Sequence, residues 1–196
     1  MRIVPANQAT WPDLQAVFGQ RGQGHQCQCQ RYKLAERESF GSAPVEERAH
    51  RLRAQTDCGR PRAASTSGLV GYLGEVPDGW CAVEPRCAYV GLVRVFTVPW
   101  VGRDEDRDDP TVWAITCLFA RAGYRRRGVC TALAGAAVEF ARDRGASAVE
   151  AYPMTTTQAR PAELHVGTVA MFRAAGLTER SRPTKRRAVL RRDFAG

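Results

Sequence analysis

The stretch RAGYRRRGVCTALAGAAVEFARDRGA, residues 121–146, places three consecutive arginines and a glycine directly before an apolar run. In that run Leu133, Ala137 and Phe140 recur at i, i+4 and i+7, the spacing of one helix face. The first N–H groups of a helix have no partners within it and carry the positive end of its dipole. Because Gly128 permits a tight turn and a close approach, the stretch predicts a phosphate cradle at a helix N-terminus. An ordinary turn with exposed arginines fits the spacing equally well.

The segment before this stretch, TVWAITCLFA at residues 111–120, is a mostly apolar run of strand length. It predicts a strand that is buried on both faces. A P-loop would require a lysine that is absent here, and a dinucleotide fingerprint would require Gly-x-Gly-x-x-Gly, whereas Gly123 and Gly128 have another separation. The pattern that remains is Arg125-x-x-Gly128-x-Cys130.

Length and composition indicate one globular domain without a membrane span. The 196 residues are 44% hydrophobic and 25% charged, and no apolar stretch approaches the roughly 20 residues that cross a bilayer. The opening MRIVPANQATWPDL has no apolar segment before a cleavage site. We therefore expect a cytoplasmic protein.

The cysteines support a reducing compartment, because their number is odd, seven, and their spacing is scattered. His25, Cys27 and Cys29 lie together in HQCQCQ. Structural zinc sites usually begin with Cys-x-x-Cys and need a second ligand pair downstream, which the sequence does not offer at a sensible spacing. We expect free thiols and no metal.

The net charge of +9 and the pI of about 9.7 predict attraction to an anion such as nucleic acid, a membrane surface or a phosphorylated cofactor. The stretch RSRPTKRRAVLRR, residues 180–192, is the most basic. The sequence has no zinc finger, no interleaved aromatic platform and no basic helix laid out to enter a groove. These features argue against nucleic acid as the partner.

Local patterns predict further elements. Thr10 caps a helix that runs through Val17, and a second helix follows Ser42 and ends at DCGRP. Two strands, residues 69–73 and 80–83, are expected to be joined by a tight connection at residues 77–79. Residues 86–111 form an excursion whose acidic run, Asp104 to Asp109, is expected to be a solvated loop, although it could also attract a cationic amine.

The Arg125-x-x-Gly128-x-Cys130 pattern resembles the Gln/Arg-x-x-Gly-x-Gly/Ala signature of the GNAT superfamily of N-acetyltransferases. In that family the backbone amides of the motif hold the pyrophosphate of acetyl-CoA. Cys130 departs from the usual glycine or alanine, but cysteine is also small. The resemblance continues through VWAITC, EAYP and GTVAMFRAAGL, and it extends to a bacterial branch that carries an N-terminal Cys-x-Cys, here Cys27 and Cys29.

The resemblance implies an α/β (α+β) fold with one GNAT-like domain over residues 1–196. It predicts a central mixed sheet of six to seven strands flanked by about four helices. Residues 1–60 would supply the N-terminal helices. Residues 69–196 would supply the hairpin, the acetyl-CoA-binding core and the C-terminal strand.

The resemblance also implies where acetyl-CoA binds. Leu118, Phe119 and Ala120 match the end of the strand whose backbone pairs with the pantetheine arm. The pyrophosphate loop and the start of the following helix match Arg125, Arg126, Arg127, Gly128, Val129, Cys130 and Thr131.

The chemistry of the family needs a proton donor for the departing CoA thiolate. In many members this donor is a tyrosine four residues before the glycine of the last helix, but here Phe172 precedes Gly176. The candidates to replace it are Tyr152, Glu150, His165 and Cys117. Each also has an ordinary interpretation, as a packed aromatic, a surface charge, a loop residue and a small core residue respectively.

The resemblance thus predicts an acyltransferase that moves an acetyl group from acetyl-CoA to a primary amine of a small molecule or peptide, by direct attack in a ternary complex. A homodimer is compatible with it. A non-catalytic acyl-CoA-binding protein is the alternative that Phe172 favours, and a basic nucleic-acid-binding module is the weaker one.

Overall fold

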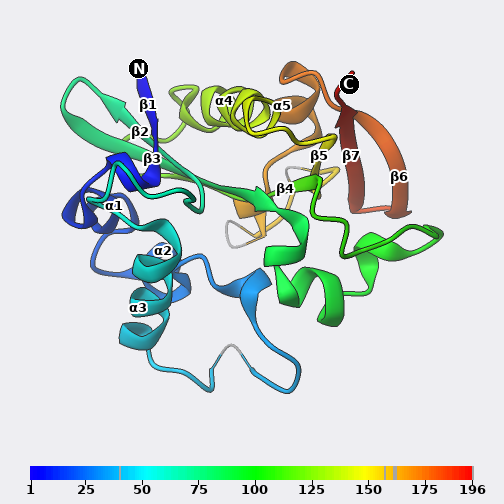
Figure 1. Ribbon diagram of the computed structural model, residues 1–196, viewed down its shortest axis with the longest axis horizontal. Helices are drawn as coiled ribbons and strands as arrows, with labels where there is room; N and C mark the ends of the chain where they lie inside the picture. The colour runs from blue at the N-terminus through cyan, green and yellow to red at the C-terminus, as the bar shows by residue number, and fades with distance from the viewer. Residues whose placement is uncertain (40, 157, 161–162, 196) are drawn as a thin grey trace.

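The computed structural model describes residues 1–39, 41–156, 158–160 and 163–195, and its strands form one seven-stranded sheet (Figure 1). The sheet order is β1-β2-β3-β4-β5-β7-β6, and its neighbours are antiparallel except for the parallel pair β4 and β5. The strands are β1 (Arg2–Pro5), β2 (Leu69–Leu73), β3 (Val76–Pro85), β4 (Val112–Ala120), β5 (Ala148–Ala151), β6 (Thr178–Thr184) and β7 (Arg187–Asp193). The predicted mixed sheet is confirmed.

Helices cover both faces of this sheet. In Figure 1, α4 and α5 lie above the sheet, whereas the N-terminal helices lie below it. The helices are α1 (Trp11–Phe18), α2 (Gly22–Cys27), α3 (Val45–Thr56), α4 (Val129–Asp143) and α5 (Val169–Ala174). Short 3-10 turns occur at Ala6–Gln8, Arg31–Lys33, Arg86–Ala88, Val98–Trp100 and Leu164–Val166, and one π-helical turn at Gly91–Val95. None of the helices described is long and apolar enough to cross a membrane.

Two helices follow from their sequence signals. The Thr10 side chain accepts a hydrogen bond from the Asp13 N–H at 3.2 Å and caps α1, which ends at a glycine. Along α4 the residues at helical spacing, Leu133, Ala137 and Phe140, are buried against the sheet. This packing fixes the N-terminus of α4 at the end of β4, where the site lies.

The connection between β2 and β3 differs from the prediction. Residues 77–79 were expected to form the turn, but β3 already begins at Val76, and the turn occupies residues 74–75. Gly74 adopts a left-handed φ of 60°, which glycine reaches without steric cost. Asp78 and Gly79 therefore lie inside a buried strand and pack beneath α4.

Candidate active site

The central strand β4 is paired along its two edges over different lengths. On one side it pairs with β3 as far as Ala120. On the other side its parallel register with β5 ends at Ile115, opposite Ala151. The backbone of Leu118 through Ala120 therefore has one edge that is not paired with β5, and an extended ligand can add to that edge as a strand does.

The N-terminus of α4 lies next to this open edge. Gly128 is left-handed, with φ at 79°, and its carbonyl accepts the first helical bond from the Ala132 N–H at 3.0 Å. The N–H groups of Val129, Cys130 and Thr131 precede that bond, so they have no partner within the helix. A Cβ added at Gly128 would meet nothing within 4 Å, so the space beside Gly128 is open.

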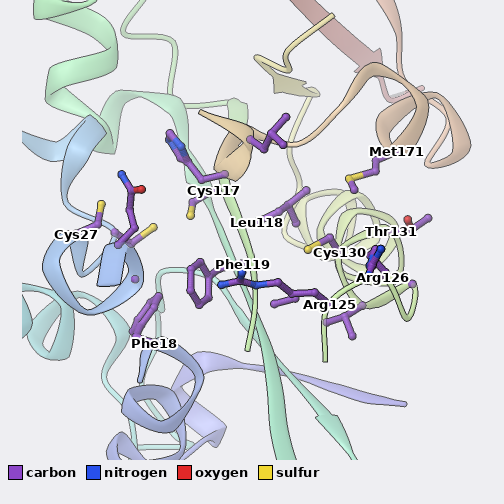
Figure 2. Close-up of a pocket in the computed structure, with 18 of the residues that line it drawn as sticks. Phe18, Cys27, Cys117, Leu118, Phe119, Arg125, Arg126, Cys130, Thr131 and Met171 are labelled. Carbon is purple, nitrogen blue, oxygen red and sulfur yellow. The ribbon is translucent and has the colours of Figure 1, made fainter. Parts of the chain in front are cut away.

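A pocket of about 480 Å³ joins the open edge of β4 to the start of α4. This volume lies within the usual range for small-molecule sites. Figure 2 shows Arg125, Arg126 and Thr131 on one side of Leu118, and Cys27 and Cys117 on the other. The pocket is lined by Phe18, Gln23, Gly24, Cys27, Cys29, Arg31, Cys117, Leu118, Phe119, Ala120, Arg125, Arg126, Gly128, Val129, Cys130, Thr131, Leu164, His165 and Met171.

The charged side chains that line the pocket are all positive among the residues that the structure describes. Arg31, Arg125 and Arg126 line the pocket, and no carboxylate of the described residues does so. Of the residues predicted to bind acetyl-CoA, all line the pocket except Arg127, whose guanidinium lies 5.5 Å from the ring centre of Tyr124. A cationic, mostly apolar pocket beside free helix amides suits a ligand with a phosphate group and a long uncharged arm.

A family model described as "Acetyltransferase (GNAT) family" matches residues 30–165, more than half of the chain. The chain belongs to the GNAT acetyltransferase family. It is therefore an acyltransferase, as its sequence predicts. No curated protein matches the sequence.

Solved GNAT structures share the fold of this chain at low sequence identity. A ribosomal-protein-alanine N-acetyltransferase from Brucella melitensis is 14% identical with a TM-score of 0.55, over 99% of this chain and 100% of that one. A GCN5-related N-acetyltransferase from Kribbella flavida is 15% identical with a TM-score of 0.54, over 98% and 97%. A PaiA N-acetyltransferase from Thermoplasma acidophilum, solved in complex with coenzyme A, is 10% identical with a TM-score of 0.50, over 98% of each chain.

Glu150, one of the predicted catalytic candidates of this GNAT chain, lies outside the pocket. Its carboxylate is fully buried and contacts the guanidinium groups of Arg86 at 3.3 Å, Arg191 at 3.0 Å and Arg103. The Tyr152 hydroxyl donates to the same carboxylate at 2.9 Å. A carboxylate with four partners in the core neutralises buried arginines, and breaking such a cluster is strongly destabilising.

Tyr152 likewise does not reach the pocket. It lines a separate cavity of about 300 Å³ together with Tyr32, Phe96 and Arg187. Burial and the neighbouring Glu150 raise the pKa of its hydroxyl well above the usual value. This placement does not support the predicted roles of Tyr152 and Glu150 in proton transfer at the pocket.

The acidic run between β3 and β4 belongs to the same cluster, and the prediction of a merely solvated loop is wrong for part of it. The Glu105 carboxylate contacts Arg86 and Arg191, each at 3.4 Å, and also Arg103. Burial opposes the ionised form of Glu105, but these arginines outweigh it and lower the pKa of the carboxyl. The carbonyl of Arg107 accepts a bond from Arg86 at 3.1 Å, so the run covers a buried arginine.

Of the four predicted candidates for the proton donor, His165 and Cys117 line the pocket. His165 lies in the 3-10 turn before α5, and its ring centre is 6.3 Å from that of Tyr32. Phe172, at the position of the family tyrosine, is fully buried in the core. A Cβ added at Gly167 would lie 2.6 Å from the Phe172 ring, so that side chain fills the space beneath the turn.

Four cysteines line the pocket, and sequence reasoning assigned a catalytic alternative only to Cys117. Cys27 and Cys29 approach from the end of α2, Cys117 from β4, and Cys130 from the first turn of α4. Burial and Asp78 raise the pKa of Cys130 to about 11, which makes it a neutral thiol. The sequence signal for Cys27 and Cys29 is the alternation Cys-Gln-Cys-Gln at residues 27–30, which does not by itself show which side chains face a cavity.

Proposed function

We propose that this GNAT chain transfers the acetyl group of acetyl-CoA to a primary amine of a small molecule or peptide, by direct attack within a ternary complex. One observation carries the proposal: a single pocket joins the unpaired edge of β4 to the free amides of α4. The pantetheine arm would pair with Leu118 through Ala120, and the pyrophosphate would lie at Arg125 through Thr131. Residues 1–196 would act as one catalytic domain.

The residues of the pocket fit acetyl-CoA on chemical grounds. Helix N–H groups and arginines suit a pyrophosphate, and a strand edge suits the amide-bearing arm. Acetyl-CoA supplies the activated thioester. The residues of the chain would orient this thioester, accept a proton from the amine and donate one to CoA. All seven cysteines are free thiols, which favours the cytoplasm of a bacterial cell as the compartment.

A non-catalytic acyl-CoA-binding protein is the second candidate, because Phe172 has no hydroxyl and is buried. It would keep the cofactor site and lose the chemistry. Binding and turnover must therefore be measured separately.

The cofactor is tested by thermal unfolding with and without acetyl-CoA. A ligand that binds the native state at about one hundred times its Kd stabilises by about 2.7 kcal/mol, and we expect Tm to rise by roughly 5–10 °C. Pantetheine, which lacks the pyrophosphate, is the matched control and should give a smaller shift. The absence of any shift with acetyl-CoA would overturn the cofactor assignment.

Turnover is tested on polyamines, aminoglycosides, free amino acids and short peptides. Released CoA should be measured by chromatography, because the seven cysteines of the protein would also react with a thiol reagent. We expect acetylation of at least one amine. Tight acetyl-CoA binding without acetylation of any compound would favour the non-catalytic candidate.

A further inference from the structure

The segment after α2 is held by two pairs of glutamine side chains. Gln28 exchanges amide hydrogen bonds with Gln15 of α1 at 2.9 and 3.3 Å. Gln30 does the same with Gln55 of α3, also at 2.9 and 3.3 Å. Both Gln28 and Gln30 are almost completely buried, so these bonds satisfy amides that would otherwise be costly in the core.

The cysteines that alternate with these glutamines face the pocket. Gln28 and Cys29 both adopt left-handed backbone angles, with φ of 43° and 50°, which are uncommon for residues other than glycine. Such conformations cost free energy and persist only where surrounding contacts impose them. The glutamine pairs supply those contacts, and the result is a fixed position for the Cys29 thiol.

The Cys29 sulfur accepts hydrogen bonds from two groups. The indole Nε1–H of Trp80, a buried residue of β3, donates to Cys29 Sγ at 3.2 Å. The Cys117 thiol of β4 is a neighbour of the same sulfur, and a hydrogen-bonding interaction between the two thiols lowers the pKa of Cys29 and raises that of Cys117. Trp80 can only donate, so it favours an electron-rich sulfur at Cys29. The hydrogen bond to Cys117 thus has Cys29 as its acceptor.

The two thiols have shifted pKa values of opposite direction. The hydrogen bond from Cys117 is the main cause that lowers the pKa of Cys29, and the Trp80 bond adds to it against burial. The hydrogen bond to Cys29 and burial raise the pKa of Cys117 well above the usual value. A pair of titratable groups whose pKa values are pushed apart is a common basis for acid and base roles.

Cys29 has one cationic and one anionic neighbour, Lys33 and Glu84. The Lys33 ammonium favours the thiolate, and Glu84, which forms an ion pair with Lys33, partly offsets it. Cys27, Cys81 and Tyr89 have raised pKa values because of burial, so they face Cys29 as neutral groups.

The thiol pair lies where the acyl end of the cofactor would lie. An arm that starts at the loop 125–131 and runs back along β4 passes Ala120 and Leu118 and reaches Cys117. Both Cys29 and Cys117 line the pocket at this end, and Figure 2 shows Cys117 on the far side of Leu118 from Arg125.

We propose that Cys29 and Cys117 are the catalytic base and acid of the acetyl transfer. The proposal rests on the proposed function and assigns its proton transfers. Cys117 thereby takes the place of the donor that Phe172 cannot provide.

The proton transfers balance over one turnover. A neutral amine attacks the thioester carbon, and the N–H proton of the resulting tetrahedral intermediate passes to the Cys29 thiolate. The C–S bond breaks, and Cys117 gives its proton to the CoA thiolate. The proton on Cys29 then moves to Cys117 through their hydrogen bond, which restores the starting pair. The net change moves one proton from the amine to CoA.

Because the two thiols are coupled, protonation of Cys29 in the first step favours proton donation by Cys117 in the second. The hydrogen bond to Cys29 is the main cause that raises the pKa of Cys117. When Cys29 becomes protonated, this cause disappears and Cys117 becomes more acidic. The acid therefore strengthens when the leaving group needs a proton.

The state of Cys29 can be measured without an acceptor amine. Iodoacetamide reacts with thiolates, and peptide mapping resolves each cysteine. We expect Cys29 to be alkylated with a midpoint below the ordinary thiol value of about 8.5, and acetyl-CoA to slow the reaction. Cys117→Ala should move the midpoint upward, whereas Cys58→Ser, outside the pocket, should not. A midpoint of Cys29 that is ordinary in the wild type would overturn the proposal.

Kinetics test the roles on the amine that the wild type acetylates fastest. Cys29→Ser keeps an acceptor for the Trp80 N–H but does not ionise, so kcat should fall by about 10²–10⁴-fold with little change in the KM for acetyl-CoA. Cys117→Ala should also lower kcat, and Cys58→Ser should not. In the wild type kcat should fall as the pH drops through the pKa of Cys29.

Three outcomes contradict the assignment and leave the proposed function intact. One is wild-type kcat in folded Cys29→Ser, and another is an unchanged pH profile in Cys117→Ala. The third is an acetyl group trapped on Cys29 without acceptor and then passed to the amine, which would make Cys29 a nucleophile. Failure of the wild type to bind acetyl-CoA would instead refute the proposed function.

Discussion

Gly128, at the start of α4, combines a left-handed backbone with open space at the position of a Cβ. Asn and Asp are the residues that best tolerate this conformation after glycine, and they have nearly the same shape. We expect Gly128→Asp to abolish the Tm shift with acetyl-CoA, because a carboxylate would stand where the pyrophosphate binds. Gly128→Asn should lose the same free energy to the left-handed backbone at residue 128 but keep part of the rise in Tm with acetyl-CoA.

Comparing Gly128→Asp with Gly128→Asn separates the effect of the added negative charge on acetyl-CoA binding from the effect of backbone strain at residue 128. Both should unfold at similar temperatures in the absence of ligand. Equal responses of Gly128→Asp and Gly128→Asn to acetyl-CoA would show that no phosphate lies at this position.

Phe172 is buried where other family members place a tyrosine, and it does not line the pocket. In Phe172→Tyr the new hydroxyl would enter an apolar core, which costs about 1–3 kcal/mol if it finds no partner. We expect a lower Tm and no gain in kcat. Phe194→Tyr, on a half-buried ring near the C-terminus, is the matched control and should leave Tm unchanged. A rise in kcat for Phe172→Tyr would show that the site lacks an acid.

At the scale of elements, the Glu150 carboxylate ties β5 to β7 and to the excursion after β3. In Glu150→Gln the charge is lost while the arginines stay buried, and we expect the free energy of unfolding to fall by about 3–5 kcal/mol. Urea unfolding would measure the change. Glu139→Gln, on the exposed face of α4, should stay within about 0.5 kcal/mol of the wild type. A comparably small loss at Glu150 would mean that the cluster contributes little.

The elements that the sequence predicts well have strong local signals. The run 111–120 is mostly apolar, and α4 has both a glycine start and a helical repeat, so the sequence predicts both β4 and α4. The signals are weak in β1, which has four residues, in α2, which contains two glycines, and in β6, whose side chains are mostly exposed and polar. These elements form because neighbouring strands and helices complete them.

The catalytic candidates depended on contacts between segments far apart in the chain. Glu150 lies on β5 and Tyr152 directly after it, but the partners of Glu150, Arg86 and Arg103, come from the excursion after β3. No local pattern predicts that pairing. The contact between Cys29 and Cys117 spans a similar distance in sequence, and it too becomes visible only in the folded chain.

For the molecule as a whole, the net charge is +9, and the pocket is lined by three arginines and by no carboxylate of the described residues. Acetyl-CoA carries several negative charges, so we expect its Kd to rise with ionic strength as screening increases. Titration calorimetry in increasing NaCl would measure the slope. Arg125→Gln should weaken binding and flatten the slope, whereas Arg62→Gln, on an exposed turn, should do neither. A Kd independent of salt would show that these arginines do not contribute to acetyl-CoA binding.

The glutamine pairs that hold residues 27–30 carry no charge and do not titrate. We therefore expect the affinity for acetyl-CoA to depend on salt concentration. The position of the Cys29 thiol, which the glutamine pairs hold, should depend on neither salt concentration nor pH. A rise in ionic strength would therefore reduce how often the enzyme is loaded with acetyl-CoA, while each loaded molecule would keep its turnover. High salt would then lower the rate reversibly, by lowering the occupancy of the cofactor site, and would leave the geometry of the two thiols unchanged.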